Sequence, residues 1–409
     1  MRAFYSLGIQ LYLALIYFAS FFNAKAKLWL IGRKHLLKTI KKEVKGRNII
    51  WFHAASVGEF EQARPLIELI KHKLPEKQIL ITFFSPSAYE LRKDYELADY
   101  IYYLPPDLKS NVSLFLDAVK PQMVFFVKYE FWFNYINEIN KRRIPLYLIS
   151  GIFRPKQHFF KWYGKWFSKH LKMFNKLFIQ DEASAKLLES IGIKNYSVTG
   201  DTRFDRVNTV IQNPKKFDCI KEFIGEEKIL LCGSSWSPDE AIILNYLKKH
   251  PKQLKLIIAP HEVNSSHIEE IEKSFKAFNP IKLSDIENGK KLDSNRVLII
   301  DSVGKLIYLY QYADIAYIGG GFGVGIHNIL EAACYGKTVF FGPNYQKFKE
   351  ARDMIEIGAA TSIANKDEFE TKLSSLLNSE KLLQQKSNLC FEYVNKNLGA
   401  SDEIFNSCF

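Results

Sequence analysis

Two glutamates in the first half of the chain each follow an apolar run and precede an amphipathic one. Glu59 lies in WFHAASVGEFEQARPLI (51–67) and Glu130 lies in VKYEFWFN (127–134). A carboxylate on the first turn of a helix can simply stabilise the helix N-terminus, by about 0.3–1 kcal/mol. It can also act chemically, because α/β proteins bind and react on loops at the carboxyl ends of parallel strands. Two such glutamates at one sheet edge could face a single cavity.

A glycine-rich motif, YIGGGFGVGIHNILEAACYGKTVFFGP (317–343), is the most informative stretch of the second half. It predicts a strand that ends in five clustered glycines, followed by a helix that His327 and Asn328 open. Glycines allow backbone N–H groups to approach a ligand, and a helix N-terminus favours phosphate. Glu331, one turn into this helix, can accept hydrogen bonds from ribose hydroxyls. The alternative is that the glycines only pack the strand against the helix.

Two further strand ends carry polar groups. IIAPHEVNSSHIEE (257–270) places His261 where it can lie near a phosphate, and Ser265 stands where a zinc motif of the H-E-x-x-H type needs histidine. GSSWSPDE (233–240) offers two hydroxyls at a helix start, where simple N-capping is the alternative. We therefore expect a nucleotide site without a metal.

The segment 154–176, RPKQHFFKWYGKWFSKHLKMFNK, holds seven basic residues and no acidic one. It predicts a long helix over 156–173 with a basic face and an aromatic remainder. Such a helix is typical of a membrane-surface element, and the alternative is a solvated lysine face over a core stripe. The lysines at helical spacing are Lys161, Lys165, Lys169, Lys172 and Lys176.

The N-terminal segment 3–22 contains twenty residues without a charge, and a bilayer core needs about 20 apolar residues as a helix. Residues 25–47 then carry nine Lys or Arg and one acid, Glu43. Because basic loops stay on the cytoplasmic side, we expect an uncleaved inner-membrane anchor with the rest of the chain in the cytoplasm. The alternative is a helix that packs on the protein or lies in the membrane interface.

Short apolar runs alternate with amphipathic segments from residue 48 onward, which indicates βαβ units and parallel sheets. The polar stretch 208–219 interrupts this alternation, so we expect two Rossmann-like, doubly wound α/β domains that face a cleft. The expected parts are an anchor (1–24), an acceptor-binding domain (25–207), a linker (208–222), a nucleotide-sugar domain (223–380) and a helical segment that crosses back to the first domain (381–409).

Composition adds two constraints. The net charge of +13 indicates an anionic partner, such as nucleic acid, a membrane or a phosphorylated substrate. The five cysteines are scattered and form no Cys-x-x-Cys pair, so a metal cage or a disulfide framework is not expected.

Several motifs together resemble the 3-deoxy-D-manno-octulosonic acid (Kdo) transferases of lipopolysaccharide synthesis, in a form associated with the Bacteroidetes. The motifs are HAASVGE followed by PLI, then KYEFW, GDTRFD, IDSVGKL, IGGGFGVGIHNILEAA and FGPN. They occur in the family's order and extend over nearly the whole chain.

The resemblance implies a GT-B glycosyltransferase that moves Kdo from CMP-Kdo to the 6′-hydroxyl of a lipid A precursor. Such enzymes invert the anomeric centre and use no metal or resident cofactor. The resemblance makes Glu59 the general base and Glu130 a second functional carboxylate. Together with the glycine loop it assigns CMP to Pro260, His261, Val303, Gly304, Lys305, Gly321, His327, Asn328, Ile329, Leu330 and Glu331. We assign the acceptor and the membrane to Ser56, Gly58, Arg154, Lys161, Lys165 and Lys169.

The chain departs from the family pattern at three residues. Lys128 replaces a glutamate, Phe133 replaces a proline and His261 replaces an arginine, and the glycine loop is about one residue short. A GT-B transferase that uses a UDP-sugar and another lipid acceptor is the alternative enzyme. A membrane or nucleic-acid binder without enzymatic activity is a further alternative, although no nucleic acid partner is expected. The number of Kdo residues transferred, the acyl pattern and the oligomeric state are left open.

Overall fold

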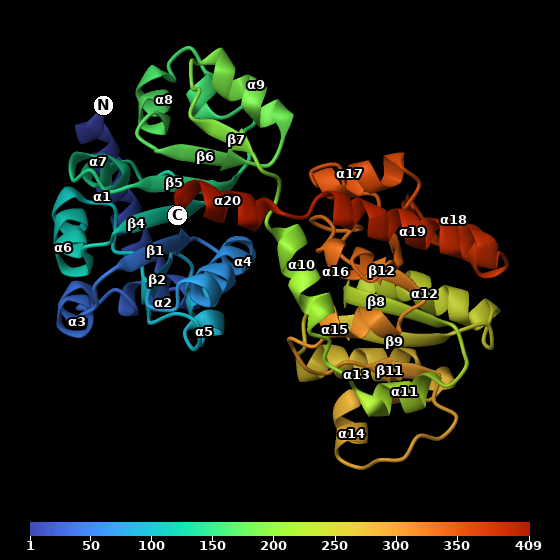
Figure 1. Ribbon diagram of the computed structural model, residues 1–409. Coiled ribbons are helices and arrows are strands. Elements are labelled where there is room, and N and C mark those ends of the chain that lie inside the picture. The colour runs from blue at the N-terminus through green and yellow to red at the C-terminus, as the bar shows by residue number, and fades with distance from the viewer. The chain divides into compact units, whose positions relative to one another are not determined.

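The computed structural model describes residues 1–409 and divides the chain into two compact units (Figure 1). Unit 1 comprises residues 1–206 and 398–409, and unit 2 comprises residues 207–397. Each unit carries one seven-stranded sheet in which all neighbouring strands are parallel. The predicted pair of doubly wound α/β domains is therefore confirmed.

The sheet of unit 1 has the strand order β3-β2-β1-β4-β5-β6-β7. Its strands are β1 (Ile49–Ala54), β2 (Gln78–Phe83), β3 (Tyr100–Tyr103), β4 (Met123–Val127), β5 (Leu146–Gly151), β6 (Lys176–Ile179) and β7 (Tyr196–Val198). The order reverses between β1 and β4. In open α/β sheets, ligands bind beyond the carboxyl ends of the strands at such a switch point.

The helices of unit 1 cover both faces of this sheet. They are α1 (Arg2–Ala19), α2 (Ala24–Ile31), α3 (Leu36–Glu43), α4 (Val57–Lys73), α5 (Pro86–Arg92), α6 (Lys109–Val119), α7 (Phe133–Lys141), α8 (Lys165–Leu171), α9 (Glu182–Ser190) and α20 (Ala400–Cys408). Side chains of β1 and β4 alternate between two buried clusters, so Trp51 and Phe126 lie on one face of the sheet. Phe52 and Phe125 lie on the other. Burial on both faces explains why the sequences of these strands are almost entirely apolar.

Unit 2 repeats the architecture with the strand order β10-β11-β9-β8-β12-β13-β14. Its strands are β8 (Ile229–Ser235), β9 (Lys255–Pro260), β10 (Pro280–Lys282), β11 (Val297–Ile299), β12 (Ile315–Ile318), β13 (Thr338–Phe341) and β14 (Ala360–Ser362). Its helices are α11 (Asp218–Ile224), α12 (Ser237–Lys249), α13 (Ser265–Ser274), α14 (Leu283–Glu287), α15 (Leu306–Leu309), α16 (Leu330–Ala333), α17 (Lys349–Glu356), α18 (Lys366–Leu377) and α19 (Glu380–Lys396). The switch point lies between β8 and β12.

The N-terminal helix α1 is long and apolar enough to cross a membrane, by length and composition. None of its residues is fully buried, but one side contacts unit 1. Arg2 donates to the Asn134 side chain at 3.1 Å, and the Tyr5 hydroxyl donates to Asp107 at 2.6 Å. The other side exposes an apolar row of Phe4, Leu7, Leu11, Leu15 and Phe18.

The predicted basic helix over 156–173 is wrong. The chain forms one 3-10 turn (His158–Phe160), turns again at Gly164, and is α-helical only in α8. A Cβ at Gly164 would lie 2.2 Å from the carbonyl oxygen of His158, so this turn packs too tightly for a continuous helix. Lys161 precedes α8 and Lys176 opens β6. The five lysines therefore do not share one helical face.

The C-terminal segment also differs from the prediction. Only residues 398–409 belong to unit 1, because α19 lies in unit 2 and α20 alone packs beside α4. The expected linker 208–222 is largely helical, since α10 (Arg203–Gln212) and α11 occupy most of it.

One carboxylate, Asp205, fixes the start of α20 on unit 1. Its two oxygens accept the backbone N–H groups of Gly399 and Ser401, each at 2.7 Å. Ile404 of α20 is then buried in the core beneath α4.

We expect Asp205→Ala to destabilise unit 1 by about 1–3 kcal/mol, because two partly buried donors lose their acceptor. Urea unfolding followed by tryptophan fluorescence measures this, since five of the six tryptophans belong to unit 1. Asp402→Ala, on the exposed side of α20, is the control and should cost no more than about 1 kcal/mol. Equal effects of the two variants would contradict the assignment.

Candidate functional site

Glu59 lies at the carboxyl end of β1, on the first turn of α4. Its Oε2 accepts the backbone N–H groups of Ala55 at 2.7 Å and Ser56 at 3.0 Å, and the Ser56 hydroxyl accepts the N–H of Glu59. This is a capping box. One carboxylate oxygen therefore makes both capping bonds, and Oε1 makes no hydrogen bond. An added Cβ at neighbouring Gly58 would meet open space, so a ligand can approach the helix start closely.

Glu130 lies beyond β4, on the other side of the switch point, and a short polar chain holds it. The Trp132 indole N–H donates to Glu130 Oε2 at 2.6 Å, and His53 Nε2 lies 2.9 Å from the same oxygen. His53 Nδ1 in turn lies 2.9 Å from the hydroxyl of Thr82, which accepts from the Trp51 indole at 2.8 Å. These contacts tie Glu130 to β1 and β2.

The charge of Glu130 acts on Glu59. Burial raises the pKa of Glu59, and the nearby charge of Glu130 raises it further, against the N–H groups of Ala55 and Ser56 and the positive influence of His53. A raised pKa makes a carboxylate a stronger base nearer to neutral pH. The predicted pair at one sheet edge is thus brought together by the fold.

The backbone between β4 and Glu130 is strained in a way that orients the turn. Lys128 has a φ of 61°, in the left-handed region that side chains rarely adopt. Strain of this kind occurs at functional sites, where surrounding contacts maintain it.

A second polar cluster holds α4 in position. Asp201 of the GDTRFD motif is buried and accepts from Gln62 of α4 at 3.0 Å and from the Arg203 guanidinium at 2.8 Å. Burial opposes its ionisation, but Arg203 and Gln62 outweigh burial and lower the pKa of Asp201. The motif therefore supports the helix that carries Glu59.

The predicted acceptor and membrane residues are not gathered as expected. Ser56 and Gly58 lie beside Glu59. Arg154 lies near Tyr129: burial raises the pKa of Tyr129, and the positive charge of Arg154 opposes this rise. Lys165 and Lys169 lie on α8, whereas Lys161 lies in the preceding turn.

Unit 2 carries a ring cluster at its switch point. The Trp236 ring stacks on His261 with centroids 4.8 Å apart, and His261 stacks on His327 at 4.3 Å. The Trp236 indole N–H lies 3.3 Å from His327 Nε2. Burial and the neighbouring His261 lower the pKa of His327 to about 4, so His327 is neutral near pH 7 and can accept this bond. The exposed His261 ring offers a flat surface to a ligand.

The glycine loop differs from the prediction. The helix expected to start at His327 is only the four-residue α16. Asn328 Oδ1 accepts the N–H of Leu330 at its start. Gly336, with a φ of 65°, ends the turn that follows it. A Cβ at Gly321 would lie 2.5 Å from the backbone nitrogen of Gly342. Gly321 is therefore a packing glycine, but it packs against the residue that follows β13 and not against the helix of the alternative interpretation.

The remaining predicted CMP residues follow neighbouring strands of unit 2. Pro260 ends β9, residues 303–305 follow β11, and Asn328 donates to Glu331 at 3.1 Å beyond β12. Ile329 and Leu330 are buried, so only their backbone can face a ligand. Residues 303–305 form an exposed turn after β11. Val303 is 76% exposed and Gly304 has a φ of 82°. The Lys305 side chain pairs with Glu287.

Sequence reasoning missed His53, Thr82 and Trp132 as partners of Glu130. His53 carried a usable signal, because a titratable residue within an otherwise apolar, buried strand needs a polar partner. Thr82 and Trp132 gave no comparable signal, since their bonds depend on the pairing of β1 with β2 and on the turn after β4.

Comparisons with known proteins identify the family of the chain. Residues 31–206 match the family model described as 3-deoxy-D-manno-octulosonic-acid transferase (kdotransferase). A 3-deoxy-D-manno-octulosonic acid transferase of Aquifex aeolicus is 30% identical over 82% of this chain and 88% of its own. A bifunctional glycosyltransferase/methyltransferase of Fusobacterium nucleatum is 28% identical over 93% of this chain, which spans 60% of that relative's length.

The fold also has solved neighbours. The UDP-GlcNAc 2-epimerase of Neisseria meningitidis superposes with a TM-score of 0.62 at 18% identity, covering 88% of this chain and 98% of its own. At that identity the likeness concerns the fold alone, which is the GT-B type.

We expect Glu130→Gln to lower the pKa of Glu59, because the substitution removes a like charge that raises it. A carbon-detected NMR titration of the Glu59 carboxyl group measures the change. Glu403→Gln, on an exposed part of α20, is the matched control. An unchanged or higher Glu59 pKa in the Glu130 variant would mean that burial alone causes the shift.

Proposed function

Since the chain belongs to the Kdo transferase family, we propose that it moves Kdo from CMP-Kdo to the 6′-hydroxyl of a lipid A precursor in lipopolysaccharide synthesis, with inversion. The observation that carries the proposal is the Glu59 carboxylate. It has a free oxygen, a raised pKa and a second carboxylate beside it at the switch point of unit 1.

In the proposed reaction, Oε1 of Glu59 takes the proton of the acceptor hydroxyl as that oxygen attacks the anomeric carbon of Kdo. The new carbon–oxygen bond forms while the bond to the CMP phosphate breaks, and the electron pair leaves with CMP. A positioned carboxylate base contributes about 10²–10⁴-fold to such a step. The backbone N–H groups that bind Oε2 hold the carboxylate in place.

Glu130 acts by position and charge. Its bonds to Trp132 and His53 fix it next to Glu59, and its charge increases the basicity of Glu59. We assign His53 and Trp132 as positioning residues, since both contact Glu130.

The donor nucleotide is assigned to unit 2. The exposed His261 and Lys305, which also pairs with Glu287, are proposed to offset charge on the leaving phosphate. The backbone N–H groups of Gly319, Gly320, Gly323 and Gly325 bond within the protein. Glu331 is proposed to accept from the ribose hydroxyls. We assign His261 and Lys305 to stabilise the negative charge of the leaving CMP, and we assign no step to a metal ion or a cofactor.

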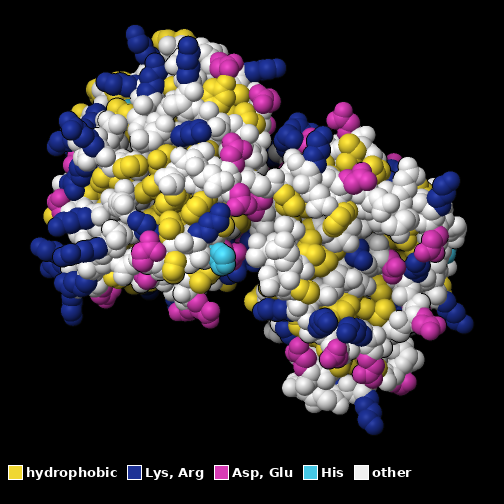
Figure 2. All heavy atoms as spheres, viewed as in Figure 1, with side chains coloured by type: hydrophobic (Ala, Val, Ile, Leu, Met, Phe, Trp, Pro, Cys, Tyr) yellow, Lys and Arg dark blue, Asp and Glu magenta, His cyan; other side chains and the backbone are white.

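The proposed place of action is the cytoplasmic face of the inner membrane. Figure 2 shows Lys and Arg side chains gathered over unit 1, interspersed with apolar patches. Basic residues near an anionic membrane surface contribute about 1 kcal/mol each, and the apolar row of α1 adds burial in lipid.

The decisive experiment incubates the purified protein with CMP-Kdo and a tetra-acylated lipid A precursor and determines the product mass. A mass increase of one or more Kdo residues supports the proposal and also gives their number. Competition by CMP but not by UDP distinguishes this donor from a UDP-sugar. No product, or inhibition by UDP alone, would contradict the proposal.

We expect Glu59→Gln to reduce turnover by about 10²–10⁴-fold, because the amide cannot accept the proton. The helix start should survive, since glutamine can make the same capping bonds. Thermal unfolding checks this point, and Glu59→Ala is the matched variant that loses the cap as well. Retention of more than about a tenth of wild-type turnover by the Gln variant would remove Glu59 from the base role.

We expect Glu331→Ala to weaken CMP binding by about 1–3 kcal/mol, the usual cost of losing one partner of a charge-assisted hydrogen bond. Calorimetric titration with CMP measures it. Glu356→Ala, on an exposed position of α17, is the control. An unchanged CMP affinity would make Glu331 a structural residue that only orients Asn328.

A further inference from the structure

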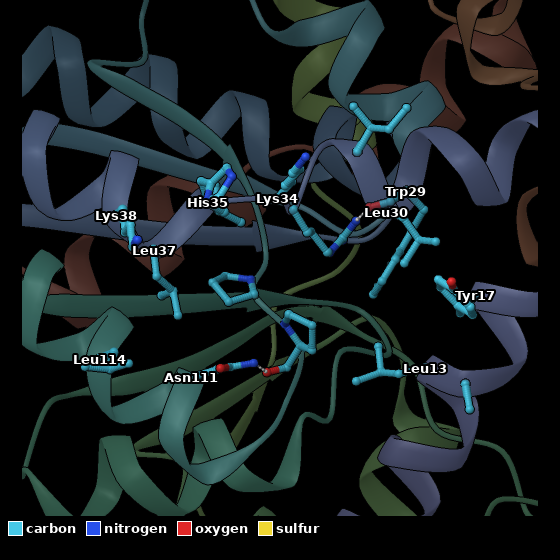
Figure 3. Close-up of a pocket in the computed structure, with 16 residues that line it drawn as sticks. Leu13, Tyr17, Trp29, Leu30, Lys34, His35, Leu37, Lys38, Asn111 and Leu114 are labelled. Carbon is cyan, nitrogen blue, oxygen red and sulfur yellow. Dashed lines mark hydrogen bonds between the residues drawn. The ribbon is translucent and has the colours of Figure 1, made fainter. Parts of the chain in front are cut away.

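A large apolar groove runs along one side of unit 1, and the proposed chemistry does not use it. It has a volume of about 920 Å³. Figure 3 shows its walls, with Leu13 and Tyr17 of α1 on one side and Leu37 and Leu114 of α3 and α6 on the other. This volume is in the range of pockets that bury most of a ligand's surface.

The charges around the groove have a single sign. Arg33, Lys34, His35 and Lys38 line it, and no acidic residue does. Arg33 is the most enclosed of them, since the other three are exposed. Its guanidinium donates to the backbone carbonyls of Trp29, Phe84 and Leu104 and pairs with no carboxylate. Burial lowers its pKa to about 9, which still leaves the guanidinium charged near pH 7. An enclosed cation without an acidic partner favours an anionic ligand.

Packed aromatic rings connect the groove wall to the carboxylate site. Trp29, a groove residue, packs edge-on against Phe84 with centroids 5.8 Å apart. Phe84 stacks on Trp132 at 5.1 Å, and Trp132 donates to Glu130. One aromatic ring, Phe84, therefore separates the groove wall from the residue that positions Glu130.

We propose that this groove holds an acyl chain of the acceptor lipid, while the basic residues beside it bind the anionic headgroup. The inference rests on the proposed function, since it assumes a lipid acceptor at Glu59. Apolar walls that carry basic residues and no acidic one suit an anionic amphiphile. The packing of Phe84 between Trp29 and Trp132 places the groove beside the residues that hold Glu130, which favours the acceptor itself over a bulk membrane lipid as the occupant.

The test uses substitutions at exposed lining residues that either reduce the volume of the groove or introduce a negative charge into it. Ala14→Trp fills part of the groove, and Leu114→Glu introduces an acid into it. The matched controls are Ala19→Trp, on the same helix but outside the groove, and Leu91→Glu, an equally exposed leucine on α5. Transfer from CMP-Kdo is measured with the acylated precursor and with its fully deacylated counterpart.

We expect each groove variant to raise the KM for the acylated acceptor by about tenfold, the loss expected when about two methylene groups stay in water. The KM for CMP-Kdo and the rate with the deacylated acceptor should match wild type, and both controls should behave as wild type with either acceptor. Groove variants that equal the controls would overturn the proposal. A loss with both acceptors would also overturn it, because the effect would not depend on acyl chains.

A second measurement does not require turnover. A photoreactive acceptor analogue with a diazirine in an acyl chain should label residues 13–17, 29–38 or 105–114, and Ala14→Trp should reduce the labelling about tenfold. Labelling confined to the exposed row of α1, or loss of binding to anionic vesicles without a change in KM, would mean that the groove takes bulk lipid, which overturns the proposal. If the wild type labels in the groove but transfers no Kdo, the proposed function fails and the groove assignment stands.

Discussion

The arrangement of unit 1 depends on keeping two carboxylates, Glu59 and Glu130, close together in a largely buried place. Like charges and burial both oppose ionisation, so each carboxylate needs its own set of donors. Backbone N–H groups at the start of α4 serve Glu59, and the Trp132 indole serves Glu130. These donors come from opposite sides of the β1/β4 switch point, which is where the strand order brings the two loops together.

The two units use the same local device for different purposes. Asp239 occupies in α12 the position that Glu59 occupies in α4, and each accepts the N–H of the residue before its helix. Asp239 is fully engaged, because Oδ1 accepts from Tyr317 and Oδ2 accepts from Gly320 and Trp236. Glu59 keeps one oxygen without a partner. Both are acidic residues at a helix start, so the tertiary contacts decide whether both oxygens of the carboxylate are bonded or one is left open to a ligand.

The sequence predicted the secondary structure that carries the two glutamates, but not the tertiary contacts around them. Alternating apolar and amphipathic segments predicted both sheets, and they placed Glu59 and Glu130 at one sheet edge because parallel strands end together. Lysine spacing predicted a helix over 156–173, but the close packing of Gly164 on the His158 carbonyl is a tertiary contact that spacing does not encode. The helix predicted from His327 is shorter for a different, local reason, since the Asn328 side chain bonds the Leu330 N–H and Gly336 turns with a positive φ. The polar chain from His53 to Glu130 required the strand register.

A buried carboxylate, Asp107, links the N-terminal helix to the segment that follows Glu130 and Trp132. Its oxygens accept the Tyr5 hydroxyl of α1 at 2.6 Å and the backbone N–H groups of Asn134 and Tyr135 at 3.1 and 3.0 Å. The latter two lie in the first turn of α7, which begins at Phe133, directly after Trp132. A displacement of α1 from unit 1 would therefore break a bond to the carboxylate that caps α7, next to the indole that holds Glu130. Since α1 also forms one wall of the apolar groove, the position of this helix is mechanically tied to both the groove and the carboxylate pair.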